Sequence, residues 1–109
     1  MRGLEEWVIQ VVERVPELRP LFDAQRKASG LIDPEVFLST AARWCIRQGP
    51  SEPVDRLFAT LDRDYATRGP KMRAAIEGAF IERIMGDDLV HRLGHNLRRA
   101  SRPRDLGHR

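Results

Sequence analysis

Two histidines and one aspartate in this chain have the spacing of a metal site. His91 and His95 lie four residues apart, and Asp87 lies four residues before His91. On a continuous helix these three side chains would share one face, as the ligands of a zinc ion must. However, Arg92 follows His91, whereas the helix of zinc proteases carries a glutamate at that position as its general base. We therefore expect solvated histidines and no metal site.

Four carboxylates could meet between two neighbouring helices and support a metal pair or acid-base chemistry. They are Asp62 and Asp64 on one expected helix and Glu77 and Glu82 on the next. A di-iron bundle also needs a Glu-x-x-His motif on two helices. The nearest run is Asp-Leu-Val-His at residues 88 to 91, and it occurs once. The pattern favours solvated helix faces over a catalytic centre.

Nucleophilic catalysis has no better candidate. Cys45 is the single cysteine, and it lies between Trp44 and Ile46 on the most apolar helix, where a thiol resists ionisation. The chain has no Gly-x-Ser-x-Gly elbow and no glycine-rich phosphate loop, because its eight glycines are scattered. We expect a protein that is not an enzyme and binds no cofactor.

Basic residues are concentrated at the C-terminal end. Residues 98 to 109 carry five arginines and one acid, a charge of +4, whereas the other 97 residues carry 14 basic and 15 acidic side chains. The five are Arg98, Arg99, Arg102, Arg104 and Arg109. A flexible basic arm can contact nucleic-acid phosphates, so a nucleic-acid-associated regulatory protein is the alternative function.

Exposed carboxylates are spread over several expected helices. The candidate partner-binding residues are Asp33, Glu35, Glu52, Asp55 and Asp62. Glu5, Glu6 and Glu13 add further acids on the first helix. If such side chains converge in space, they would steer association with a basic protein partner.

The elements that must position these residues are amphipathic helices. Apolar residues recur at three- and four-residue spacing, and Gly and Pro separate the periodic segments. The expected helices cover residues 4–15, 20–29, 34–48, 51–65, 70–85 and 89–97. Asp33 and Ser51 are expected to cap helices, Gly30 is expected to end one, and Gly94 weakens the last.

These patterns predict an all-α fold: a compact bundle of five to six short helices with a flexible, Arg-rich C-terminal tail. No segment has the period-two alternation of a half-buried strand. The helix over residues 34–48 is apolar around much of its circumference, so we expect it at the centre. The predicted domain covers residues 1–98, and residues 99–109 are predicted to be a disordered basic tail.

Length and composition are those of one globular domain. The chain has 109 residues, of which 41% are hydrophobic and 32% charged. The arginine-rich composition fits a GC-rich bacterial source. One cysteine allows no internal disulfide, and no segment looks like a signal peptide or membrane span, so we expect a cytoplasmic protein without membrane contact.

The order of elements resembles a family of small, uncharacterised bacterial helical domains. The matching pieces are a Val-Pro-Glu-Leu-Arg-Pro run at residues 15–20, Pro-Glu-Val-Phe at 34–37 and Phe-Ile-Glu-Arg-Ile at 80–84. The likeness covers residues 4–86 and leaves the Arg-rich extension outside. It implies a companion of toxin systems or a general interaction domain, with no active-site residue to carry over.

We therefore expect a non-enzymatic protein-binding module. Its specific form is an immunity-type inhibitor that presents an acidic helical face to a basic bacterial toxin domain. A stable inhibitory interface buries roughly 1,200 to 2,000 Å² in total, which two or three helices of such a domain can supply.

Overall fold

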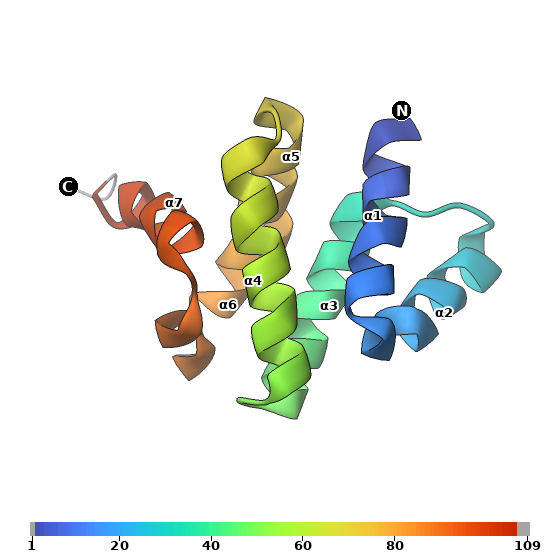
Figure 1. The fold of residues 1–109 in the computed structure, drawn as a ribbon, viewed down its shortest axis with the longest axis horizontal. Helices are drawn as coiled ribbons and strands as arrows, with labels where there is room; N and C mark the ends of the chain where they lie inside the picture. The colour runs from blue at the N-terminus through green and yellow to red at the C-terminus, as the bar shows by residue number, and fades with distance from the viewer. Residues whose placement is uncertain (1, 107–109) are drawn as a thin grey trace.

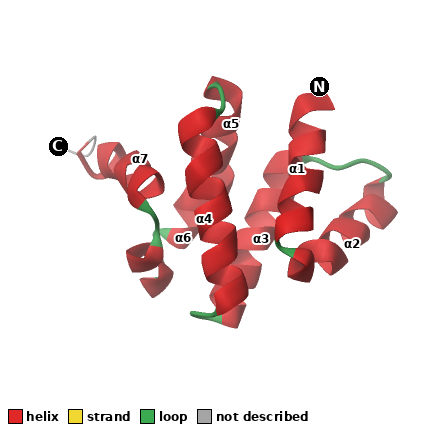
Figure 2. Cartoon of the chain, viewed as in Figure 1, coloured by secondary structure: helices red, strands yellow, loops and turns green. Residues whose placement is uncertain are grey.

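The protein, described here from a computed structural model over residues 2–106, consists of helices joined by short loops in that range (Figures 1 and 2). The predicted all-α fold is confirmed. The α-helices are α1 (Arg2–Arg14), α2 (Arg19–Ser29), α3 (Pro34–Gln48), α4 (Glu52–Thr67), α5 (Pro70–Ala75), α6 (Glu82–Ile84) and α7 (His95–Leu106). Two 3₁₀ turns, η1 (Pro16–Leu18) and η3 (Asp88–Arg92), and one π-helical segment, η2 (Ile76–Ile81), lie between them. Each of these helices is too short or too polar to span a bilayer.

Local sequence signals explain most helix boundaries. The Asp33 carboxylate accepts hydrogen bonds from the backbone N–H groups of Glu35, at 3.0 Å, and Val36, at 3.4 Å, so it caps α3 as predicted. Gly30 ends α2 with a left-handed φ of 77°. Ser51 precedes α4, but its hydroxyl does not cap that helix and has no hydrogen-bond partner among the described residues. The predicted side-chain cap at Ser51 is therefore wrong.

The helices pack in two layers. In Figure 1, α1 and α4 lie in front of α3 and of the continuous helix formed by α5, η2 and α6. The predicted central position of α3 is confirmed, because α3 packs against α1, α2, η2, α5 and α6. Two of its apolar residues nevertheless face solvent: the side chains of Val36 and Ile46 are 50% and 37% exposed. These five elements cover most of the helix, and Val36 and Ile46 lie outside their reach.

The π-helical segment η2 changes which residues of the continuous helix α5–η2–α6 face the core. One extra residue per turn lets Phe80 and Ile81, which are neighbours in sequence, both be fully buried. The ring of Phe80 packs edge-to-face on Phe58 of α4, with centroids 5.7 Å apart. The Ser39 hydroxyl of α3 donates to the backbone carbonyl of Ala79, at 3.3 Å, and so satisfies one acceptor within this segment.

The last expected helix is interrupted. The sequence predicted one helix over residues 89–97, but the chain forms η3, bends at Leu93 and Gly94, and restarts as α7. Leu89, Leu93 and Leu97 are still buried, so their apolar spacing reflects packing and not one continuous helix. The backbone of α7 continues to Leu106, so the boundary predicted between residues 98 and 99 falls inside a helix. Residues 107–109 lie outside the described part of the chain.

Candidate functional site

Two of the predicted partner-binding carboxylates on α4 form intramolecular ion pairs. Asp55 accepts hydrogen bonds from Arg92 Nε, at 2.9 Å, and Arg92 Nη2, at 2.6 Å. These bonds lower the pKa of Asp55 and raise that of Arg92. Glu52 accepts from Arg56, which also contacts Glu17 at 3.1 Å, and these carboxylates raise the pKa of Arg56. Much of the charge of Glu52 and Asp55 is thus neutralised within the chain.

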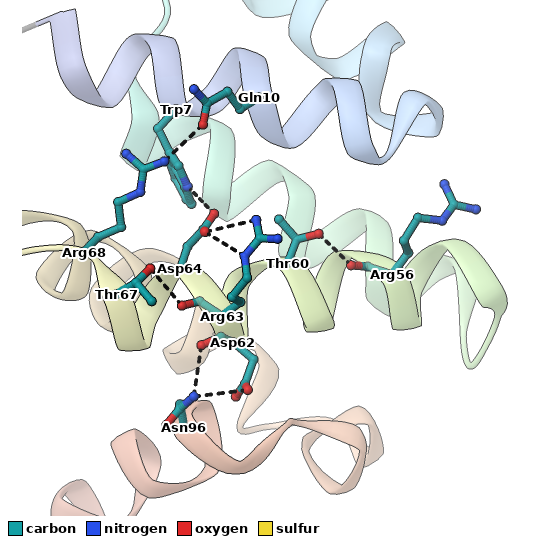
Figure 3. A network of polar contacts seen from close by, with 10 residues as sticks. All are labelled: Trp7, Gln10, Arg56, Thr60, Asp62, Arg63, Asp64, Thr67, Arg68 and Asn96. Atoms are coloured by element: carbon teal, nitrogen blue, oxygen red, sulfur yellow. Dashed lines mark hydrogen bonds and ion pairs between the residues drawn. The ribbon is translucent and has the colours of Figure 1, made fainter.

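Asp62, a third candidate on α4, anchors α7. Its Oδ1 accepts the backbone N–H of Leu97, at 2.9 Å, and its Oδ2 accepts from the Asn96 amide, at 3.3 Å (Figure 3). The same carboxylate lies directly over Gly94, where a Cβ would be 2.6 Å from Asp62 Cγ. Asp62 therefore supplies the side-chain cap of α7, a role that the sequence did not reveal because its partner residues lie more than 30 positions away.

The five predicted partner-binding carboxylates do not converge on one surface. Asp33 and Glu35 lie at the start of α3, whereas Glu52 and Asp55 begin α4, just beyond the end of α3. An α-helix of 15 residues is about 22 Å long, which separates the two pairs. Asp62 lies further along α4 and faces α7. An acidic face composed of these five residues is therefore not present.

A different acidic surface lies on α1. Trp7, Val8, Val11 and Val12 point into the core, and the opposite side of the helix carries Glu6, Ile9 and Glu13 at helical spacing. All three are exposed, including Ile9 with 38% of its side-chain surface accessible. Neither Glu6 nor Glu13 forms an ion pair with a side chain of residues 4–100, the part of the chain whose side chains are described. We call Glu6, Ile9 and Glu13 the acidic α1 face.

The four carboxylates considered as a catalytic cluster, those of residues 62, 64, 77 and 82, do not share one site. Asp64 is buried, with 5% of its surface accessible, and accepts the Trp7 indole N–H at 2.7 Å (Figure 3). Arg63 contacts the other Asp64 oxygen at 3.3 Å. Glu77 accepts the Tyr65 hydroxyl, and Glu82 is exposed. The carboxylates thus have different partners, and they do not form the paired arrangement that a catalytic cluster requires.

The other chemical candidates are also separated or buried. His91 belongs to η3 and His95 begins α7, and the bend between these elements removes the continuous helix that would align them. No group of three or more metal-ligating side chains occurs in the described part of the chain. Cys45 is fully buried, and burial raises the pKa of its thiol to about 12.

The arginines of the basic segment have different surroundings. The Arg98 guanidinium donates to the backbone carbonyls of His91, at 2.9 Å, and Leu93, at 3.2 Å, so it links α7 to η3. Arg99 lines a concavity that α7 forms with α4 and α5. The backbone of residues 102 and 104 belongs to α7, while Arg109 lies outside the described residues. The predicted nucleic-acid segment therefore begins on a docked helix.

A concavity lies between α4, α5, η2 and α7. It has a volume of about 580 Å³ and is lined by Tyr65, Ala66, Arg73, Glu77, Asn96, Arg99 and Ala100. We call this concavity the α4–α7 cleft. Sequence reasoning missed it because Tyr65 has core spacing and because the other residues come from separate helices. The docking of α7 through Asp62 brings them together.

Comparison with curated protein sequences and with solved structures gave no significant match. A family model does match residues 8–107, and the family is described as a domain of unknown function, DUF7674. It includes η3 and α7, so the expectation that the segment after Gly86 lies outside the family pattern is wrong. The implied kinship with immunity proteins has no support in this match. Because the match covers nearly the whole chain, the protein belongs to the DUF7674 family.

Proposed function

We propose that the protein is a non-enzymatic protein-binding module and that the acidic α1 face contacts its partner. The observation that carries the proposal is the pair of unneutralised carboxylates, Glu6 and Glu13, beside the exposed Ile9. An apolar contact supplies affinity once water is excluded, and flanking charges of one sign accelerate encounter with a partner of the opposite sign. The partner of this face is therefore a basic protein surface.

The more specific form of this proposal is an immunity-type inhibitor of a basic toxin domain. An inhibitor of this kind needs no reactive group of its own, because it acts by covering the active site of its target. The inward roles of Asp62, Asp64 and Cys45 are consistent with such a protein, since these groups stabilise the fold and contribute nothing to its surface chemistry.

The test compares two variants that change net charge equally. Glu6→Lys/Glu13→Lys reverses the acidic α1 face, and Asp23→Lys/Asp88→Lys reverses two exposed carboxylates elsewhere. Proteins retained by the immobilised wild-type chain are identified by mass spectrometry, and their association rates are then measured by surface plasmon resonance. We expect the α1 variant to slow association roughly tenfold at low salt, and the control to change it little.

Two results would contradict the proposal. One is equal association rates for the two variants, because the location of the charge would then be irrelevant. The other is the absence of any protein retained specifically by the wild-type chain. If the retained protein is a toxin whose activity the wild-type chain blocks, the inhibitor form gains direct support.

The alternative function, nucleic-acid binding, has fewer available arginines than the sequence predicted. Arg98 donates to backbone carbonyls. Of the arginines in that segment whose side chains are described, Arg98 and Arg99, only Arg99 has no hydrogen bond to residues 4–100. A single such arginine offers few phosphate contacts, so the nucleic-acid alternative has less support than the acidic α1 face.

A further inference from the structure

The α4–α7 cleft is separate from the acidic α1 face and has the size of a small-molecule site. Its volume of about 580 Å³ lies within the usual range of roughly 300 to 1,000 Å³ for ligand pockets. Its lining combines two alanines with five polar or charged side chains from three helices. A few convergent polar groups on apolar walls are typical of a binding pocket.

One cation in the cleft is held in place before any ligand arrives. Arg73 Nε donates to the Tyr65 backbone carbonyl at 3.1 Å, and its guanidinium carbon lies 5.6 Å from the centroid of the Tyr65 ring. The carbonyl bond and the ring contact together restrict the side chain. The two terminal nitrogens of Arg73 make no hydrogen bond to residues 4–100, whose side chains are described, so they retain their donors for an external acceptor.

The Tyr65 ring that supports Arg73 is itself fixed. Its hydroxyl donates to the Glu77 carboxylate across the two helices. This bond occupies one Glu77 oxygen and orients the ring against which the Arg73 guanidinium lies. The result is a chain of contacts, from Glu77 through Tyr65 to Arg73, that preorganises the cleft wall.

Arg99 contributes a second cation from α7. It is exposed and has no hydrogen bond or ion pair within the described residues. Other arginines differ: Arg56 and Arg92, for example, are bound by carboxylates of this chain. The cleft thus contains two guanidinium groups and one carboxylate, and that carboxylate is already hydrogen-bonded to Tyr65. Its side chains therefore carry more positive than negative charge.

A second groove provides an internal comparison. It lies between α3 and η2, measures about 460 Å³, and is lined in part by Arg43 and Arg83. No hydrogen bond, ion pair or ring contact with residues 4–100, whose side chains are described, orients either guanidinium. Each groove therefore contains two arginines, but only the α4–α7 cleft has an arginine that contacts within the chain hold in place.

From these contacts we propose that the α4–α7 cleft binds a small ligand through an oxyanion, a phosphate or carboxylate group, held by Arg73 and Arg99. The planar guanidinium fork matches both kinds of oxyanion with paired N–H donors. Glu77 has a second oxygen, and Asn96 has an amide oxygen, that can accept hydrogen bonds from hydroxyl or amine groups on the rest of the ligand. The ligand class is thus a small anion that also carries hydrogen-bond donors.

The experiment titrates the ¹⁵N-labelled full chain with sodium phosphate, and separately with sodium acetate, at ionic strength held constant with chloride. Backbone amides and the Nε–H signals of Arg73 and Arg99 report binding. We expect saturable shifts at the cleft residues with a dissociation constant on the order of 1 mM. Arg99→Gln should weaken binding about tenfold, whereas Arg43→Gln, in the other groove, should not change it. The arm with the tighter binding identifies phosphate or carboxylate as the group recognised.

Three outcomes would overturn the proposal. The first is a lack of saturable shifts at the cleft with either anion. The second is equal affinity of the wild-type and Arg99→Gln chains. The third comes from a single-stranded oligothymidylate: much tighter binding than inorganic phosphate, with a steep salt dependence, would show that the cleft belongs to a nucleic-acid interface. None of these results depends on a partner of the acidic α1 face, so the two proposals fail independently.

Discussion

The indole N–H of Trp7 donates to the carboxylate of Asp64 at 2.7 Å, and both side chains are buried. This hydrogen bond joins α1 to α4 across 57 positions of sequence. A second contact between the same helices, Arg68 Nη2 to Gln10 Oε1 at 3.0 Å, lies nearer the surface (Figure 3). Together with the packing of α1 on α3 and α4, these two hydrogen bonds hold α1 in the bundle, and with it the acidic α1 face.

Trp7→Phe should destabilise the fold strongly. The change removes a donor to a buried carboxylate and leaves Asp64 with the Arg63 contact alone, so we expect a loss of about 2–3 kcal/mol in unfolding free energy. Urea denaturation followed by circular dichroism measures it. The matched control is Trp44→Phe, because Trp44 is also buried but its indole donates no hydrogen bond to a described residue. Equal losses for both variants would show that the bond to Asp64 adds nothing beyond packing.

Gly94→Ala should loosen α7. The added methyl group would be 2.6 Å from Asp62 Cγ, so either Asp62 or the start of α7 must shift, at a cost of roughly 1–3 kcal/mol. Amide hydrogen exchange should become faster in the first turns of α7 and remain unchanged in α3. Gly86→Ala is the control, because a Cβ at Gly86 meets no atom within 4 Å. Unaltered exchange in α7 would refute the anchoring role of Asp62.

The Asp55–Arg92 pair should make stability depend on pH in the acid range. The pKa of Asp55 is lowered in the folded protein, so the pair stabilises the fold above the ordinary aspartate pKa of about 3.9, and this contribution is lost as pH falls through the lower folded value. Asp55→Asn should therefore be less stable than wild type near neutral pH, with the difference vanishing in strong acid. The effect is small because both side chains are exposed to salt and water. A difference that stays constant to pH 2 would contradict this account.

Cys45 should be unreactive in the native protein. Burial raises the pKa of its thiol to about 12, so the thiolate is scarce at pH 8, and the fully buried sulfur is also inaccessible. A disulfide reagent such as DTNB should label it only as fast as the protein opens, and immediately in urea. Rapid labelling under native conditions would place Cys45 near the surface and would reopen the question of thiol chemistry.

The sequence by itself determined the helices and much of the core. The period of the apolar residues predicted α1 through α4 closely, and Asp33 and Gly30 marked helix ends because capping depends on neighbours within a few residues. Cys45 was correctly placed in the core for a similar reason, since it lies on the most apolar helix. Local sequence also gave an acidic outer side to the first helix, although the candidate partner-binding residues that it suggested lie on other helices.

Tertiary structure decided which charges remain available. Asp55 and Asp62 look like ordinary surface acids in the sequence, yet one pairs with Arg92 and the other caps α7, both through contacts more than 30 residues apart. The glycine at position 94 also reflects a tertiary contact, because the Asp62 carboxylate leaves no room for a side chain there. The α4–α7 cleft exists only after this docking. Periodicity records which side of a helix is apolar, but the pairing of polar groups depends on how helices are placed against one another in three dimensions.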